Sequence, residues 1–219
     1  TGVGSIDSTY RANTDAGFSI VTYTGNGGNT SKTVAHGLNA TPDFLLVKAR
    51  DATTGWVVHH SSKPGKIFYL HSDAAEQSST ALSTPNSSTI TVGDTWTNNT
   101  DDLHVAYCWS EVEGYSKFGS YIGNGDTDGP FVYCGFKPNY LLFKSASATS
   151  HWVIYDSKRN AYNEVDLQLL TNHGNAEAAF SRPVDFLSNG FKIRFSAYLN
   201  ISDDTYIFAA FAESPFKYS

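Results

Sequence analysis

The sequence repeats a series of short phrases, in the same order, roughly a hundred residues apart. YTGNG at Tyr23 returns as YIGNG at Tyr121, and FLLVKA around Lys48 returns as YLLFKS around Lys144. The same series continues with WVVHH and WVIYD, and then with AYCWSE and FAAFAE. Self-similarity at a fixed spacing indicates that one folding unit occurs twice. We therefore expect a first unit at 17–115 and a second at 116–219, related by a pseudo-twofold axis and sharing one core.

The composition predicts an all-β chain of the β-sandwich or jelly-roll kind. Aromatic residues make up 14%, charged residues only 16%, and there are 18 glycines, which is typical of short strands joined by polar turns. The polar residues 1–16 are interpreted as a strap or linker, and a short helix is expected only within 67–79 or 164–179. The expected strands are 18–23, two hairpins (43–49 with 56–60, and 140–145 with 151–155) and two central strands (103–112 and 205–212).

Charge and hydropathy exclude several classes of function. The net charge is -6, and the longest basic cluster is the dipeptide Lys158-Arg159, so no electrostatic footprint for nucleic acid is present. The apolar runs are far shorter than the roughly 20 residues of a membrane helix. The lack of methionine suggests a processed chain or an excised domain, and Cys108 and Cys134 are either two free thiols or one bridge.

The stretch NGDTDG resembles the start of a calcium loop, with Asn124, Asp126 and Asp128 at alternate positions. The twelfth place of such a loop needs a bidentate glutamate, but Gly135 stands there. The sister stretch TGNGGN lacks the aspartates. We therefore interpret the stretch as a turn, with calcium as the less favoured alternative and no other cofactor indicated.

Glu111 and Glu113 are the only candidate catalytic pair. On a strand, residues two apart point to one face, which would place the two carboxylates side by side, as a retaining glycosidase requires. In the second copy only Glu213 remains, followed by Ser-Pro-Phe. A glutamate kept at the end of both copies is more simply a structural residue, paired for example with Lys117 or Lys217.

Aromatic residues supply the candidate binding surface. Those that recur at equivalent places are expected in the core, because a duplicated fold keeps its packing residues. The non-repeated ones are the better candidates for stacking on sugar rings or on another chain, and they are Trp96, Tyr155, Tyr162 and Tyr198.

Several long phrases, among them GFSIVTYTGNG, VAHGLNATPDFLLVKARD, WVIYDSKRNAYN and YIFAAFAESPFK, resemble a repeat domain of bacteriophage tail and other virion structural proteins. The resemblance implies a β-sandwich in the style of concanavalin A-like lectins, exposed on a virus particle. The family offers no catalytic residues to carry over.

The function expected from these observations is that of a non-enzymatic, extracellular virion module for assembly or for adhesion to host-surface glycans. Its partners would be other virion chains, including copies of itself, with a trimer as one candidate assembly and with neither nucleic acid nor membrane insertion. One alternative is a glycoside hydrolase that acts on bacterial polysaccharide through Glu111 and Glu113. The other is a purely architectural spacer.

Overall fold

The computed structural model describes residues 2–27 and 30–213, and the regular structure within these ranges consists of β-strands without any helix. The all-β prediction is therefore confirmed. The prediction that a short helix could form within 67–79 or 164–179 was wrong, because both segments contribute strands to antiparallel sheets. No helix long and apolar enough to cross a bilayer occurs in the described ranges.

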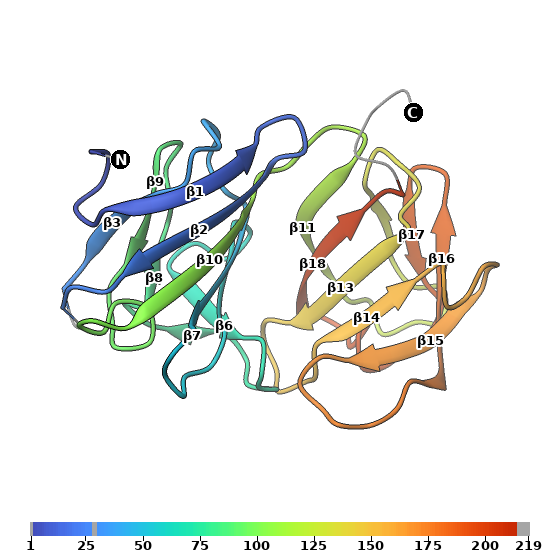
Figure 1. Cartoon of the computed structure of the whole chain (residues 1–219). Helices are drawn as coiled ribbons and strands as arrows, with labels where there is room; N and C mark the ends of the chain where they lie inside the picture. Colours follow the sequence, from blue (N-terminus) through green and yellow to red (C-terminus); the bar gives the residue numbers. More distant parts are fainter. Residues whose placement is uncertain (1, 28–29, 214–219) are drawn as a thin grey trace. The chain divides into compact units, whose positions relative to one another are not determined.

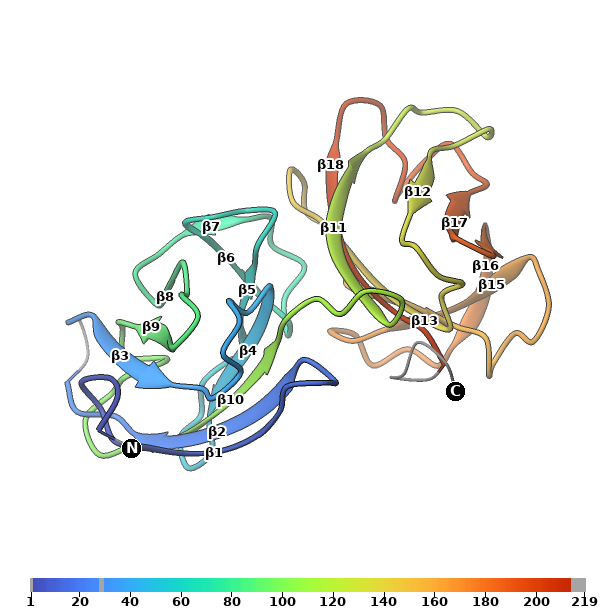
Figure 2. The same ribbon diagram turned by 90° about the horizontal axis from the view of Figure 1, so that it is seen from above.

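The chain divides into two compact units, one made of Thr1–Leu70 with Glu76–Glu111 and the other of His71–Ala75 with Val112–Ser219. The first unit holds a seven-stranded and a three-stranded sheet, which face each other in Figure 2. In sheet order the larger comprises β1 (Ser8–Asn13), β2 (Phe18–Thr24), β10 (Leu103–Trp109), β4 (Phe44–Ala49), β5 (Val57–His60), β6 (Lys66–Tyr69) and β7 (Gln77–Ser78). The smaller comprises β3 (Lys32–Ala35), β9 (Thr89–Val92) and β8 (Leu82–Ser83).

The second unit is built on one eight-stranded sheet that curls into a nearly closed, barrel-like shape (Figures 1 and 2). Large aromatic side chains fill it, and Phe143, Tyr155 and Tyr206 are among the fully buried residues of its core. In sheet order the strands are β11 (Ser116–Ile122), β18 (Thr205–Phe211), β13 (Tyr140–Ser145), β14 (Val153–Asp156), β15 (Val165–Leu170), β16 (Ala178–Leu187), β17 (Gly190–Ile193) and β12 (Phe131–Tyr133).

Five neighbouring strands have the same order and register in both units. The order β2-β10-β4-β5-β6 of the first unit corresponds to β11-β18-β13-β14-β15 of the second. Tyr23 pairs with His104 as Tyr121 pairs with Tyr206, and the hairpins of both units form as the sequence predicted. The strands β10 and β18 are central, as expected of their long β-prone runs.

The buried apolar residues form two clusters, one drawn from each unit. The expectation of one core shared by both halves was wrong for the described residues, because each set of sheets encloses its own side chains. Cys108 lies in the first cluster and Cys134 in the second, and both are free thiols. The interpretation of 1–16 as a linker also needs correction, since residues 8–13 form the edge strand β1 and Ile6 is buried in the first core.

A buried asparagine closes the same loop in each unit. In the second unit, Asn200 accepts a hydrogen bond from the Asn124 backbone N–H at 2.9 Å. Its amide nitrogen donates to the Asp126 and Phe195 carbonyls at 2.7 and 2.8 Å. In the first unit, Asn98 accepts from the Asn26 N–H at 3.1 Å and donates to the Gly27 carbonyl at 2.7 Å. Both asparagines are fully buried, so each satisfies backbone groups that water cannot reach.

The glycine that follows the repeated tyrosine is required by close backbone approach. A Cβ on Gly25 would lie 1.9 Å from the Asn99 carbonyl oxygen, and one on Gly123 would lie 2.2 Å from that of Ile201. Such contacts would force the two loops apart, because the carbonyl oxygen in the way belongs to the backbone and cannot move aside as a flexible side chain could.

We therefore expect Gly123→Ala to lower the free energy of unfolding by about 2 kcal/mol or more. Thermal unfolding followed by circular dichroism measures the effect. Gly174→Ala is the matched control, since Gly174 is exposed and a Cβ there meets nothing within 4 Å. Equal melting temperatures for the two variants would contradict this account of the loop.

His59 is a buried titratable group in the first unit, where β5 pairs it with Leu45. It is 1% exposed, and its Nδ1 has no hydrogen-bond partner in the described parts of the chain. Burial, reinforced by the charge of His60, lowers the pKa of His59 from 6.5 to about 4. The corresponding place in the second unit holds Tyr155, paired with Leu141.

Acid should therefore destabilise the fold before its carboxylates titrate. Between pH 6.5 and about 4 the unfolded chain protonates His59 while the folded chain does not, so the free energy of unfolding falls as pH falls, by up to about 3 kcal/mol. We expect His59→Leu to flatten this slope in denaturant titrations repeated across that window. An unchanged slope would remove His59 as its source.

Candidate functional site

Two of the four aromatic candidates belong to the cores. Tyr155 is fully buried, and its hydroxyl donates to the Arg182 carbonyl at 2.7 Å while accepting from the Gln168 amide. Trp96 is half-buried against the first core, with its ring centroid 5.0 Å from that of Tyr69. Both rings are needed for packing, so their assignment to a binding surface was wrong for Tyr155 and is not favoured for Trp96.

Tyr198 is half-buried and one face of its ring is already covered. The Arg182 guanidinium carbon lies 4.0 Å from the ring centroid, within the range of a cation–π contact. Burial raises the pKa of the Tyr198 phenol. A sugar would have to displace the arginine to stack there.

Tyr162 is the aromatic candidate that the structure presents to solvent, with 87% of the residue exposed. It lies in the loop between β14 and β15, and two asparagines fix that loop. The Asn163 side chain bonds both backbone groups of Phe186, at 2.9 and 3.0 Å, and the Asn160 side chain accepts from the Leu167 N–H at 2.8 Å. The ring is therefore carried on an anchored loop.

Beside this loop lies a cleft of about 480 Å³, lined mainly by polar side chains. It continues into a smaller hollow of about 120 Å³ that Tyr162 borders and that shares Lys137, Ser157 and Ala161 with it. The remaining residues that line the larger cleft are Pro138, Asn139, Lys158 and Glu213. We call the two hollows together the Tyr162 cleft.

The ends of strands position the polar groups of the cleft. Ser157 follows β14, and its N–H donates to the Asn139 carbonyl at 2.9 Å while its hydroxyl donates to the Asn139 side-chain oxygen. Asp156 then accepts from the backbone N–H groups of Lys158 and Arg159, at 3.0 and 2.9 Å. This turn is the Asx type that aspartate favours, and it directs Lys158 to the cleft.

Charge in the cleft comes from Lys137, Lys158 and Glu213. Lys158 Nζ lies 2.5 Å from a carboxylate oxygen of Glu213. This hydrogen bond lowers the pKa of Glu213, and the charge of Lys137 adds to the effect. For the glutamate at this position the sequence suggested a lysine such as Lys117 or Lys217 as partner. Glu213 pairs with Lys158, and Lys217 lies outside the described residues.

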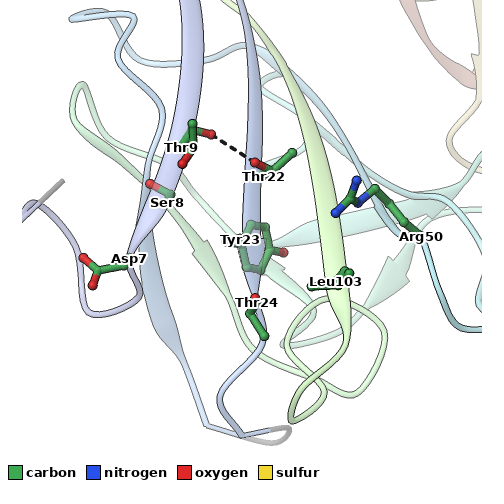
Figure 3. A pocket seen from close by; sticks show the side chains of 8 residues that line it. All are labelled: Asp7, Ser8, Thr9, Thr22, Tyr23, Thr24, Arg50 and Leu103. Carbon is green, nitrogen blue, oxygen red and sulfur yellow. Dashed lines mark hydrogen bonds between the residues drawn. The ribbon is translucent and has the colours of Figure 1, made fainter.

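The first unit has a hollow of about 370 Å³ on β1, β2 and β10 (Figure 3). Thr9, Thr22 and Thr24 line it together with Arg50 and Asp7. Its one aromatic residue, Tyr23, is 4% exposed, with its hydroxyl bonded to the Thr97 carbonyl. This hollow therefore offers hydroxyl groups but no ring face, whereas the Tyr162 cleft offers both.

The candidate catalytic pair is not on a strand. β10 ends at Trp109, and the Glu111 N–H donates to the Asp43 carboxylate at 2.8 Å. Glu113 lies in the turn that the Val112–Ser116 bridge closes. The alternation that would have placed the two carboxylates on one face does not apply there. The hydrolase hypothesis needed a strand that includes Glu111, and the prediction that the strand extends to residue 112 was wrong.

The NGDTDG stretch is a turn whose oxygen atoms have protein partners. The Asn124 side-chain oxygen accepts from the Asp126 N–H and the Asn200 amide, at 3.0 and 2.9 Å. The Asp128 carboxylate lies 2.8 Å from Lys192 Nζ, which lowers the pKa of Asp128. No group of three or more His, Cys, Asp or Glu suited to a metal occurs among the described residues. The three proposed ligands are thus held by amides and a cation.

Sequence reasoning missed Lys137 and Lys158 as cleft residues. A signal existed, because the connection that carries Tyr162 is longer than its counterpart. In the first unit Phe68 lies ten positions after its strand partner Val58, and in the second Leu169 lies fifteen positions after Ile154. A connection that is longer in one unit than at the matching place in the other marks a loop free to acquire a role.

The chain matches the family model of a domain of unknown function, DUF7483, over residues 1–215. No curated protein and no solved structure matches the chain.

We expect calcium chloride to leave the melting temperature unchanged, because the Asp128 carboxylate is already paired with Lys192. Differential scanning calorimetry with calcium and with EDTA measures this. A melting temperature that rises with calcium, and does so in the wild type but not in Asp126→Asn, would restore NGDTDG as a metal site.

Proposed function

This chain belongs to DUF7483, a domain family of unknown function, and from its own residues we propose that it is a non-enzymatic carbohydrate-binding module of a virion surface protein. The observation that carries the proposal is the exposed ring of Tyr162 beside a polar cleft. Sugar rings have an apolar C–H face and a hydroxyl rim, so they suit an aromatic ring next to amides and hydroxyls.

The virion setting rests on the resemblance of the long repeated phrases to phage tail and virion repeat domains. The low content of charged residues and the all-β fold suit such a particle surface. In that setting copies of the chain would assemble as a homo-oligomer, for example a trimer, together with other virion proteins. Repetition of a weak sugar site on one particle raises the effective affinity for a glycan-covered host.

The two units are further proposed to be tandem copies of one β-sandwich-like unit. The common strand order and register support this, as do the equivalent bonds made by Asn98 and Asn200. One copy supplies the Tyr162 cleft and the other supplies scaffold. A duplicated fold with a site in one copy is the outcome expected when loops change faster than the sheets that carry them.

A glycan array tests the proposal. We expect the purified chain to bind one class of bacterial surface glycan, and Tyr162→Ala to abolish the signal, because the variant removes the ring but no packing contact. Tyr133→Ala is the matched control, since Tyr133 is 64% exposed on β12 and does not line the cleft. A silent array with correctly folded protein would favour the architectural spacer instead.

A further inference from the structure

The Tyr162 cleft holds more positive than negative charge. We propose that it binds the acidic group of an anionic sugar residue, and that Lys137 and Lys158 select that group. This inference rests on the proposed carbohydrate binding and adds the chemical class of the ligand. The shared chemistry is a pyranose that bears a carboxylate or a phosphate.

The charges of the cleft are available to a ligand. Lys137 is exposed and makes no salt bridge with the described residues, and the side chains of Lys158 and Glu213 are each 70% exposed. Ion pairs this exposed contribute little to stability and open readily. Among the described residues, an incoming anion therefore finds one ammonium group without a salt bridge, that of Lys137, and a second, that of Lys158, whose exposed partner is easily exchanged.

The first unit shows that the fold does not need these lysines. Thr41 and Ser62 stand in its sequence where the second unit has Lys137 and Lys158, each 96 positions further on. The strand-end bond around them is nevertheless the same, with Ser61 N–H donating to the Asp43 carbonyl at 2.7 Å as Ser157 donates to Asn139 at 2.9 Å. The two lysines are thus additions to a frame that closes without them.

The same copy also carries the longer connection with the exposed ring. Two cations and an aromatic face therefore occur together on one cleft of one copy. A pyranose stacked on Tyr162 would direct a ring substituent into the cleft, where an acidic group gains charge-assisted hydrogen bonds from Nζ. A neutral sugar would leave those ammonium groups without an anion.

The inference is tested by replacing each lysine with the residue of the first unit. Calorimetric binding of the whole chain is measured for Lys137→Thr, Lys158→Ser and the double variant. One panel contains uronate oligosaccharides, each with its carboxyl-reduced form, and a second contains phosphorylated oligosaccharides, each with its dephosphorylated form. Lys32→Thr is the control, because Lys32 lies on β3 in the first unit, outside the cleft.

We expect acidic members of one panel to bind about tenfold or more tightly than their neutral forms. The double variant should remove that difference, the control should retain it, and rising salt should reduce it. The panel that binds identifies the acidic group as carboxylate or phosphate.

Equal affinity for acidic and neutral forms, or an acid preference that survives in the double variant, would overturn the inference and leave carbohydrate binding standing. Failure of the wild type to bind any member of either panel would overturn this inference, and a silent array of neutral glycans as well would overturn the proposed function. Binding that is lost in Tyr162→Ala but unchanged in the lysine variants would support carbohydrate binding and contradict the selection of an acidic group.

Discussion

The fold of each unit depends on one buried side-chain amide that joins two loops. Asn200 links the loop after β11 to the loop before β18, and these two strands are neighbours in the sheet. An amide has one acceptor oxygen and two donor hydrogens, so a single residue satisfies backbone groups of both loops at once. The tie fixes where the two strands begin to pair. Register matters here because a slip of one residue between the strands would turn either Tyr121 or Tyr206 out of the core.

The frame that this tie fixes tolerates change in the connections between strands. The order and register of five strands are the same in both units, yet the connection after β14 is longer than the one after β5. Because the strand ends match in the two units, the connection that follows β5 or β14 starts at the same place in each sheet whatever its length. In the second unit this connection borders the Tyr162 cleft and is anchored through Asn160 and Asn163. Precision of the strands and freedom of the loop are both needed for such a site.

The sequence predicted most of the strands because alternation and repetition report the sheet directly. The strand at 18–23, both hairpins and both central strands occur in the structure. The sequence did not predict contacts between residues that lie far apart in the chain. The turn at Asn124 is held by Asn200, 76 residues away. β10 ends at Trp109, and soon after it the Glu111 N–H bonds to the carboxylate of Asp43, 68 residues away, rather than to a neighbouring strand. Tyr155 was misplaced because its counterpart His59 differs in type while sharing its buried position.

The NGDTDG turn and the Tyr162 cleft differ in how their charges are balanced. Asp128 in the NGDTDG turn is paired with Lys192, so its negative charge serves the fold. In the Tyr162 cleft two lysines face one carboxylate, so positive charge is left over. The net charge of -6 does not oppose an anionic ligand there, because at physiological ionic strength charges more than roughly 8 Å apart are largely screened. What an anion meets in the cleft is therefore its nearest neighbours, Lys137 and the Lys158–Glu213 pair.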